Sequence, residues 1–224
     1  MRHLRTAVLT AAVLALLPAT ASAKTVFLDT YERRDDGFIG PVQSQRLKAD
    51  LPYIASIKGT VSYQDRRVWG AACGTPLRRP QFPSPRRRNG RVGADAAWVF
   101  ANFGEFCRTG TGLGFAVFLK VATRGTYADA QLLDGPPTGP RSDHTYRFAL
   151  RGGGRRAKFR IPESYVRDNY GRFRITVRRA RANECTGARA AVFGYASNEE
   201  CVAAVGGVRP APAPTPVPAP TPTA

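Results

Sequence analysis

The sequence predicts an all-β protein, a jelly-roll-like β-sandwich whose strands are joined by long loops rich in proline and glycine. The clearest observation is that Phe173, Ile175 and Val177 alternate with polar residues directly after a polar turn at Asp168–Gly171. This period of two is typical of a strand with one buried face, and Asx and Gly residues favour the turn. Similar short segments recur along the chain without a convincing amphipathic helix, which favours a sandwich over a helical fold.

In chain order, the first strands are expected at Thr25–Tyr31 and Tyr53–Tyr63, the second with a bend or bulge at Gly59. A long irregular loop rich in proline is expected at Cys73–Gly93. The glycines at Gly152–Gly154 belong to a five-residue loop that predicts a β-hairpin between the strands on either side. The remaining strands are expected at Ala96–Ala101, Gly114–Val121, Thr145–Arg151, Ala157–Ile161, Arg172–Val177 and Arg189–Tyr195.

Both ends of the chain have the composition of segments outside the domain. Residues 1–23 combine a charged start, a short apolar run and a small-residue cleavage motif, Ala21-Ser22-Ala23, which predicts a secretory signal peptide. Residues 209–224 are rich in proline and are expected to form a disordered extended tail. The domain is therefore expected at 24–208, secreted or extracellular, with association with the cell wall as a further expectation. No later stretch is long and apolar enough to predict a transmembrane segment.

The chain is strongly basic. Its 34 Lys and Arg against 16 Asp and Glu give a formal net charge of +18, and only two of these cations lie in the expected signal peptide. Such a charge attracts polyanions, although a genome-wide bias towards Arg would also produce it. Because no recognition helix is expected, specific binding to nucleic acid is not predicted, whereas an exported protein would meet anionic wall polymers, acidic glycans or lipid headgroups.

Four cysteines in an exported chain predict disulfide bonds. Three connectivities exist, and Cys73–Cys107 with Cys185–Cys201 is favoured because each pair closes a local loop. A zinc site is the weaker alternative, since there is no Cys-x-x-Cys motif and His144 is the one histidine of the expected mature chain.

Cations occupy the polar positions of three successive strands. The alternation predicts that these side chains share the solvent side of the sheet, and if the strands are neighbours, one face of the sheet is covered with positive charge. Like charges side by side destabilise a sheet, which suggests an anionic ligand, while a merely solvated face is the alternative. The residues are Arg147 and Arg151, Lys158 and Arg160, and Arg172, Arg174 and Arg178.

The segment Arg160-Ile-Pro-Glu-Ser-Tyr165, followed by the Asp168-Asn169-x-Gly turn and the alternating strand, resembles the C-terminal hairpin of bacterial β-sandwiches of the galactose-binding-domain-like class. Calcium-dependent lectins belong to this class, and the resemblance implies that Asp168 and Asn169 contribute oxygens to a calcium ion that also holds a sugar. Calcium requires six to eight oxygens, so further ligands would be needed, and a purely structural turn is the alternative. Tyr165 and Tyr170 are candidates for stacking on a sugar.

Catalysis receives little support. The chain has no Gly-x-Ser-x-Gly or His-Glu-x-x-His motif, and no nucleophile is placed to complete a catalytic group with His144. We expect a non-catalytic binding module of the cell envelope, with a glycan or another anionic polymer as the ligand. The alternatives are an adhesion or structural envelope protein without a small ligand, and a carboxylate-dependent glycan hydrolase. Candidates for the hydrolase by residue type alone are Asp29, Glu32, Asp35 and Asp36.

Overall fold

A computed structural model describes residues 23–30, 38–62, 93–101, 114–162 and 170–207. These residues form two antiparallel sheets, one of nine strands and one of four, with short helices after the last strand. The all-β class is therefore confirmed, while the jelly-roll connectivity stays a prediction. The signal peptide, the proline-rich tail and most of the Cys73–Gly93 loop lie outside the described residues, so those expectations stay predictions too.

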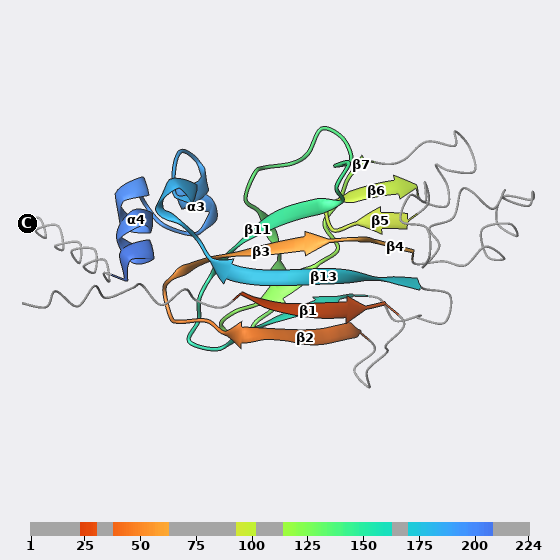
Figure 1. Ribbon diagram of the computed structural model, residues 1–224, viewed down its shortest axis with the longest axis horizontal. Coiled ribbons are helices and arrows are strands. Elements are labelled where there is room, and N and C mark those ends of the chain that lie inside the picture. Colours follow the sequence, from red (N-terminus) through yellow and green to blue (C-terminus); the bar gives the residue numbers. More distant parts are fainter. Residues whose placement is uncertain (1–22, 31–37, 63–92, 102–113, 163–169, 208–224) are drawn as a thin grey trace, which may run out of the picture.

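The larger sheet is built around β13 (Tyr170–Arg179), which pairs with β3 (Pro52–Lys58) on one side and β1 (Lys24–Asp29) on the other. Beyond β3 follow β11 (Thr145–Arg151) and β10 (Gln131–Leu132), and Figure 1 shows β11, β3, β13 and β1 side by side. The far end is extended by β4 (Thr60–Ser62), β5 (Gly93–Asp95), β6 (Trp98–Ala101) and β7 (Gly114–Phe115).

The bend expected at Gly59 is present, because β3 ends at Lys58 and β4 begins at Thr60. Gly59 has φ +130°, and a Cβ atom there would lie 2.7 Å from the carbonyl oxygen of Arg172. Only glycine fits this conformation and this close approach. The bend lets the β3–β4 segment pair with β11 along its first part and with β5 along its second.

The smaller sheet has the order β2 (Ile39–Arg46), β12 (Arg156–Ile161), β8 (Lys120–Ala122), β9 (Ala128–Asp129). The predicted hairpin is wrong, because β11 and β12 belong to different sheets and β12 pairs with β2 and β8. Gly152 and Gly153 carry the chain from one sheet to the other. A Cβ atom at either glycine would collide with a backbone carbonyl, of Lys48 and of Thr123 respectively. The glycines thus serve a close crossing rather than a hairpin turn.

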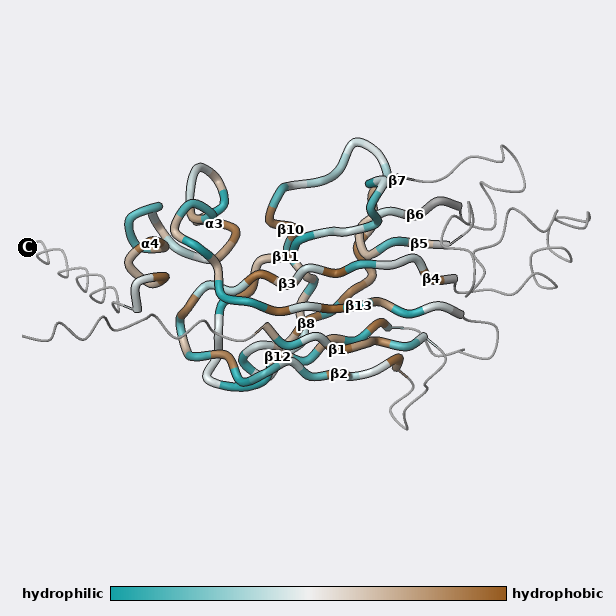
Figure 2. The backbone as a smooth tube through the Cα atoms, viewed as in Figure 1, coloured by the Kyte–Doolittle hydropathy of each residue, from teal (hydrophilic) through white to brown (hydrophobic). Residues whose placement is uncertain are grey.

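The hydrophobic core lies between the two sheets and uses the inward positions of the alternating strands. Figure 2 shows hydrophilic and hydrophobic segments following each other along β13. This arrangement buries large apolar side chains from both sheets and leaves the polar positions on the two outer faces. The fully buried members include Leu28, Ile39, Ile57, Tyr146, Phe148, Phe159, Phe173, Ile175 and Val177.

A helical cap, residues 181–207, follows β13 and covers one end of the larger sheet (Figure 1). It contains the short 3₁₀ helix η2 (Ala182–Glu184), α3 (Arg189–Val192) and α4 (Asn198–Gly206). The strand predicted at Arg189–Tyr195 is wrong. Phe193 and Tyr195 are buried instead in a second core, which packs on the outer face of the larger sheet. The sheet contributes Ile54 and Ala149 to that core.

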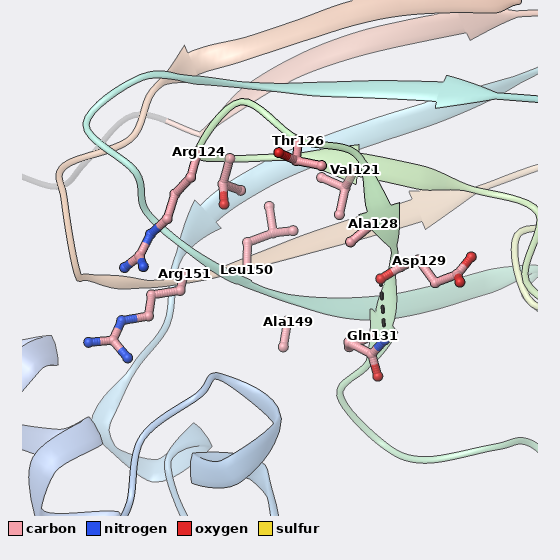
Figure 3. Close-up of a pocket in the computed structure, with 10 residues that line it drawn as sticks. Val121, Arg124, Thr126, Ala128, Asp129, Gln131, Ala149, Leu150 and Arg151 are labelled. Carbon is pink, nitrogen blue, oxygen red and sulfur yellow. Dashed lines mark hydrogen bonds between the residues drawn. The ribbon is translucent and has the colours of Figure 1, made fainter.

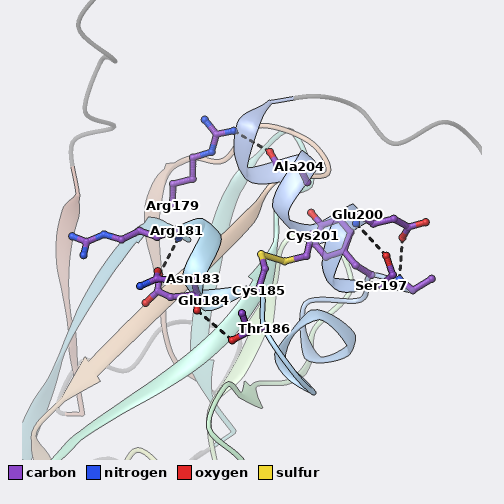
Figure 4. Close-up of a disulfide and its surroundings, with 12 residues drawn as sticks. Arg179, Arg181, Asn183, Glu184, Cys185, Thr186, Ser197, Glu200, Cys201 and Ala204 are labelled. Carbon is purple, nitrogen blue, oxygen red and sulfur yellow. Dashed lines mark hydrogen bonds between the residues drawn. A yellow bond between two sulfur atoms is a disulfide. The ribbon is translucent and has the colours of Figure 1, made fainter.

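The cap is closed by the predicted Cys185–Cys201 disulfide, which the structure confirms with an S–S distance of 2.02 Å (Figure 4). Helix α4 begins at an N-cap, Ser197, whose Oγ accepts a hydrogen bond from the Glu200 backbone N–H at 3.2 Å. The sequence Ser197-x-x-Glu200 is a known helix-start signal, so α4 could have been expected from the sequence. Among the described residues, no helix is long and apolar enough to cross a membrane.

Candidate functional site

The outer face of the larger sheet carries a row of three exposed side chains, one from each of three neighbouring strands. In the strand register Arg174 of β13 lies opposite Phe27 of β1 and also opposite Lys58 of β3. Cross-strand partners share one face of the sheet, so the three side chains point to the same side. Phe27 is 47 % exposed, and both cations are exposed. Since strands lie about 4.8 Å apart, the row spans about 10 Å between its outer Cα atoms.

The next row on this face consists of hydroxyl side chains. Thr176 of β13 lies opposite Thr25 of β1 and opposite Ser56 of β3. The hydroxyl oxygens of Thr25 and Thr176 are 3.0 Å apart and share a hydrogen bond. A hydroxyl both donates and accepts, so this row offers neutral polar groups directly beside the cations.

Arg172 completes this surface and fixes the aromatic ring. Its guanidinium carbon lies 4.6 Å from the centre of the Phe27 ring, a cation–π contact. Asp29 lies opposite Arg172 in the register and places one carboxylate at the border. We call the surface made by Phe27, Lys58, Arg172 and Arg174, with the hydroxyls of Thr25, Ser56 and Thr176, the open face. In the part of the chain that the structure describes, neither Lys58 nor Arg174 forms an ion pair.

The same sheet face is different under the helical cap, where the arginines are neutralised. Glu184 of η2 accepts two hydrogen bonds from Arg178, at 2.6 and 2.7 Å, and one from Arg147 at 3.4 Å. Burial alone would raise the pKa of Glu184, but the hydrogen bonds from Arg178 and from the Arg181 backbone N–H outweigh it. They hold this pKa below its ordinary value.

A second acid completes this network. Asp134, in the turn directly after β10, accepts hydrogen bonds from Arg147 at 2.6 and 2.8 Å and from Arg189 of α3 at 2.9 Å. Burial would raise the pKa of Asp134, and the two guanidinium groups more than compensate and lower it. The network therefore joins β11, β13 and the cap, and it leaves Arg147 and Arg178 with a structural role.

The predicted single cationic face is wrong in its arrangement. Arg147, Arg172 and Arg174 lie on the outer face of the larger sheet, but Lys158 and Arg160 lie on β12 in the smaller sheet. The physical reason is the crossing at Gly152 and Gly153, which moves β12 to the opposite layer. Phe27 and Lys58 were not among the predicted site residues. The alternation in Lys24–Asp29 is the signal that would have placed Phe27 on the polar side of its strand.

The predicted calcium turn lies outside the described residues, as do Tyr165, Asp168 and Asn169, and also Cys73 and Cys107. The backbone of Tyr170 begins β13, and its side chain lies outside what the structure describes. Among the described residues, no three side chains of His, Cys, Asp or Glu gather as a metal site. The calcium hypothesis therefore stays a prediction.

A small groove of about 190 Å³ lies between the sheet edges formed by β8–β9 and β10–β11 (Figure 3). Leu150 and Ala149 contribute to its apolar lining, and Arg124 and Arg151 lie at one end. Both arginines pair with Asp50, at 2.7 and 3.4 Å. The groove's own carboxylate, Asp129, pairs with Lys120. Its charges are thus already matched within the protein.

A buried polar cluster lies beside β4 and β11. The Asp95 carboxylate accepts a hydrogen bond from Thr60 Oγ1 at 2.6 Å and lies 2.9 Å from His144 Nδ1. Burial raises the pKa of Asp95. The hydroxyl of Tyr146 donates a hydrogen bond to Asp95, and burial raises the pKa of Tyr146 to about 12. An Asp–His pair fixes the orientation of the imidazole. Here it also joins the β4–β5 extension to the start of β11.

The function of this protein has to be argued from the geometry described above, because comparison with known proteins gave no match. No family model matches the chain, and neither a curated protein nor a solved structure is similar to it.

Proposed function

We propose that this protein is an exported, non-catalytic binding module that holds an acidic glycan, a polymer of uronic acids, on the open face. The observation that carries the proposal is the row Phe27–Arg174–Lys58 next to a row of hydroxyl groups. Its two cations have no ion-pair partner among the described residues. The disulfide supports an oxidising compartment outside the cytoplasm.

Each chemical group of a uronic-acid chain has a counterpart on the open face. Guanidinium and ammonium groups attract carboxylates, and the hydroxyls of Thr25, Ser56 and Thr176 can exchange hydrogen bonds with sugar hydroxyls. The half-exposed Phe27 ring offers an apolar surface of the kind that stacks on the C–H side of a sugar ring. Adjacent strands place the groups of each row about 4.8 Å apart, and an extended polymer chain can lie along such a row.

The first test measures binding of the purified protein to polygalacturonate at increasing salt, with uncharged dextran as the reference polymer. The double variant Lys58→Thr, Arg174→Thr is compared with the charge-matched Lys48→Thr, Arg181→Thr, whose cations are exposed and lie outside the strands of both sheets. Two surface charge contacts of about 0.7 kcal/mol each correspond to about a tenfold loss of affinity. The control is expected to lose less than about threefold.

An equal loss in both double variants would reduce the interaction to general charge attraction and would contradict the proposal. Binding of the wild type to dextran as tight as to polygalacturonate would contradict it as well. Circular dichroism spectra that agree among the three proteins confirm that the fold is intact.

Phe27→Ala separates sugar binding from polyanion binding. Loss of a stacked ring costs about 1 kcal/mol, so we expect about a fivefold loss on polygalacturonate. On polyphosphate, which has no sugar ring, the same variant is expected to bind nearly as well as the wild type. Equal losses on the two polymers would overturn the assignment of a glycan and leave a general polyanion surface.

The two alternatives are distinguished in the same experiments. If the protein is a structural or adhesion protein without such a ligand, the wild type and the open-face variant should bind every polymer with the same affinity. A carboxylate-dependent hydrolase predicts that the polymer shortens during incubation. The groove offers that chemistry only Asp129, which Lys120 already pairs at 2.5 Å.

A further inference from the structure

The outer face of the smaller sheet is also cationic, and it is separate from the open face. Arg156, Lys158 and Arg160 occupy alternate positions of β12 and therefore share one face, about 6.6 Å apart along the strand. Arg46 of β2 lies directly opposite Arg156. Arg46, Arg156 and Lys158 are exposed. We call these four residues the second face.

The charges of the second face are not neutralised by acids of the described residues. Arg46 Nε donates to the carbonyl oxygen of Gly154 at 2.8 Å, and Arg156 donates to the carbonyl oxygen of Ser44 at 3.3 Å. Backbone carbonyls orient the two guanidinium groups but carry no charge. Lys158 lies opposite Gln43, a neutral side chain. Like charges next to each other cost stability in a sheet, and a bound polyanion would relieve that cost.

Arg160 is held in a way that suits it to a carboxylate. Its guanidinium carbon lies 4.0 Å from the centre of the Phe38 ring and 3.7 Å from the centre of the Tyr127 ring. These two cation–π contacts stabilise and orient the side chain. Its Nε is buried and has no hydrogen-bond partner within the described ranges, so only the terminal N–H groups can serve a ligand. A planar guanidinium held by ring contacts can direct its remaining N–H groups to a carboxylate in the bidentate geometry.

The two faces point in opposite directions because they belong to different layers of the sandwich. Packed sheets lie about 10 Å apart, and the outward side chains of each point away from the other. The crossing of the chain at Gly152 and Gly153 produces this separation. A single short stretch of polymer therefore contacts one face at a time.

From this arrangement we infer that the protein is bivalent: the open face and the second face each bind a uronic-acid chain, so that one molecule cross-links two chains. The inference rests on the proposed function, since both faces take the same ligand. Its consequence is that the protein acts as a bridge within an acidic polysaccharide matrix rather than as a simple surface adhesin.

The experiment has two measurements on the full protein as it is exported. Isothermal titration with short oligogalacturonides gives the number of binding sites, and light scattering with long polygalacturonate reports cross-linking across a range of protein-to-polymer ratios. The variants are Lys58→Thr, Arg174→Thr for the open face and Arg156→Thr, Lys158→Thr for the second face, which leaves the ring-stacked Arg160 in place. Scattering of the protein without polymer shows whether it associates by itself.

We expect two oligomers per wild-type molecule, one per molecule in each double variant, and scattering with long polymer only in the wild type. One oligomer per wild-type molecule, lost in the open-face variant and kept in the second-face variant, would overturn bivalency while leaving the proposed function intact. Absence of binding in the wild type would instead overturn the proposed function. Scattering that persists unchanged in both variants would overturn bivalency, because cross-linking would then not depend on the two faces.

Discussion

Two halves of one sheet surface contain the same kinds of side chain and differ in what lies over them. Arg174 and Arg178 occupy the same face of β13, four residues apart. Arg178 lies under the helical cap, where Glu184 binds it through two hydrogen bonds. Arg174 is exposed beside Phe27 and Lys58, without an ion pair to any described acid. Whether an arginine on a strand is structural or available for a ligand therefore depends on the segment packed above it.

The largest expected effect comes from opening the cap. The Cys185–Cys201 bond closes a loop with a sequence separation of 16 residues, so its loss costs about 3 kcal/mol of unfolding free energy in the chain-entropy model. Cys185→Ser, Cys201→Ser should lower the midpoint of thermal unfolding strongly while binding to polygalacturonate below the transition is kept. Differential scanning calorimetry measures the first and salt-dependent binding the second. Loss of binding at a temperature where this variant is folded would show that the open face depends on the helical cap, which would contradict the expectation.

Removal of the central acid has the next largest effect. Glu184→Gln keeps the shape of the side chain but weakens hydrogen bonds to two arginines, which should cost about 2 kcal/mol of unfolding free energy. The same substitution releases positive charge, so polygalacturonate should bind more tightly and elute at higher salt. Urea unfolding and salt elution measure the two changes. A variant of unchanged stability would contradict the structural role of this acid.

The pH dependence should show the same contribution through Glu184. Its pKa is lowered in the folded protein, so its stabilising contribution is present above the pKa of the unfolded chain, about 4.5. That contribution is lost as the pH falls through the lower folded value. The stability difference between wild type and Glu184→Gln is therefore expected to be full at pH 7 and to shrink below about pH 4.5. Urea unfolding at a series of pH values checks it, and a difference that does not change with pH would contradict the assignment.

The smallest effect on stability is expected on the open face. Arg174→Thr removes a cation that faces Lys58 across the strands and introduces a residue favoured in sheets. The unfolding free energy should stay within about 0.5 kcal/mol of the wild type. The matched substitution Arg178→Thr, on the same strand and face, should cost about 2 kcal/mol because Glu184 loses its main partner. Equal losses of stability at the two positions would remove the distinction between the halves.

Part of the fold could be predicted from the sequence, as particular residues show. The alternation of Phe173, Ile175 and Val177 located the inner side of β13 correctly, and the bend at Gly59 was expected from its place inside a strand pattern. The strand prediction for Arg189–Tyr195 was wrong because a short apolar run does not distinguish a strand from a short helix. Here the helix inserts Phe193 and Tyr195 into a second core. The helix that follows this segment, α4, does have a start signal in the sequence, Ser197-x-x-Glu200.

The candidate site was only partly within reach of the sequence. Arg172 and Arg174 were expected on the solvent side of their strand and lie there, exposed. Phe27 and Lys58 were missed, because their position beside Arg174 depends on the pairing of strands that are far apart in the chain. Arg147 was a candidate for binding and is held instead by Asp134 and Glu184, a contact that no local pattern encodes.

The sequence alone predicts which side chains alternate on each strand and that the protein is all-β, and it favours a bond between Cys185 and Cys201 over the other possible pairings. These are local properties, set by backbone geometry and short separations along the chain. The tertiary structure was needed to show that β12 joins the opposite sheet from β11 and β13, and which arginines the cap neutralises. Both follow from long-range packing, in which the glycine crossing at residues 152 and 153 and the placement of Glu184 over β13 bring together residues that sequence spacing does not relate.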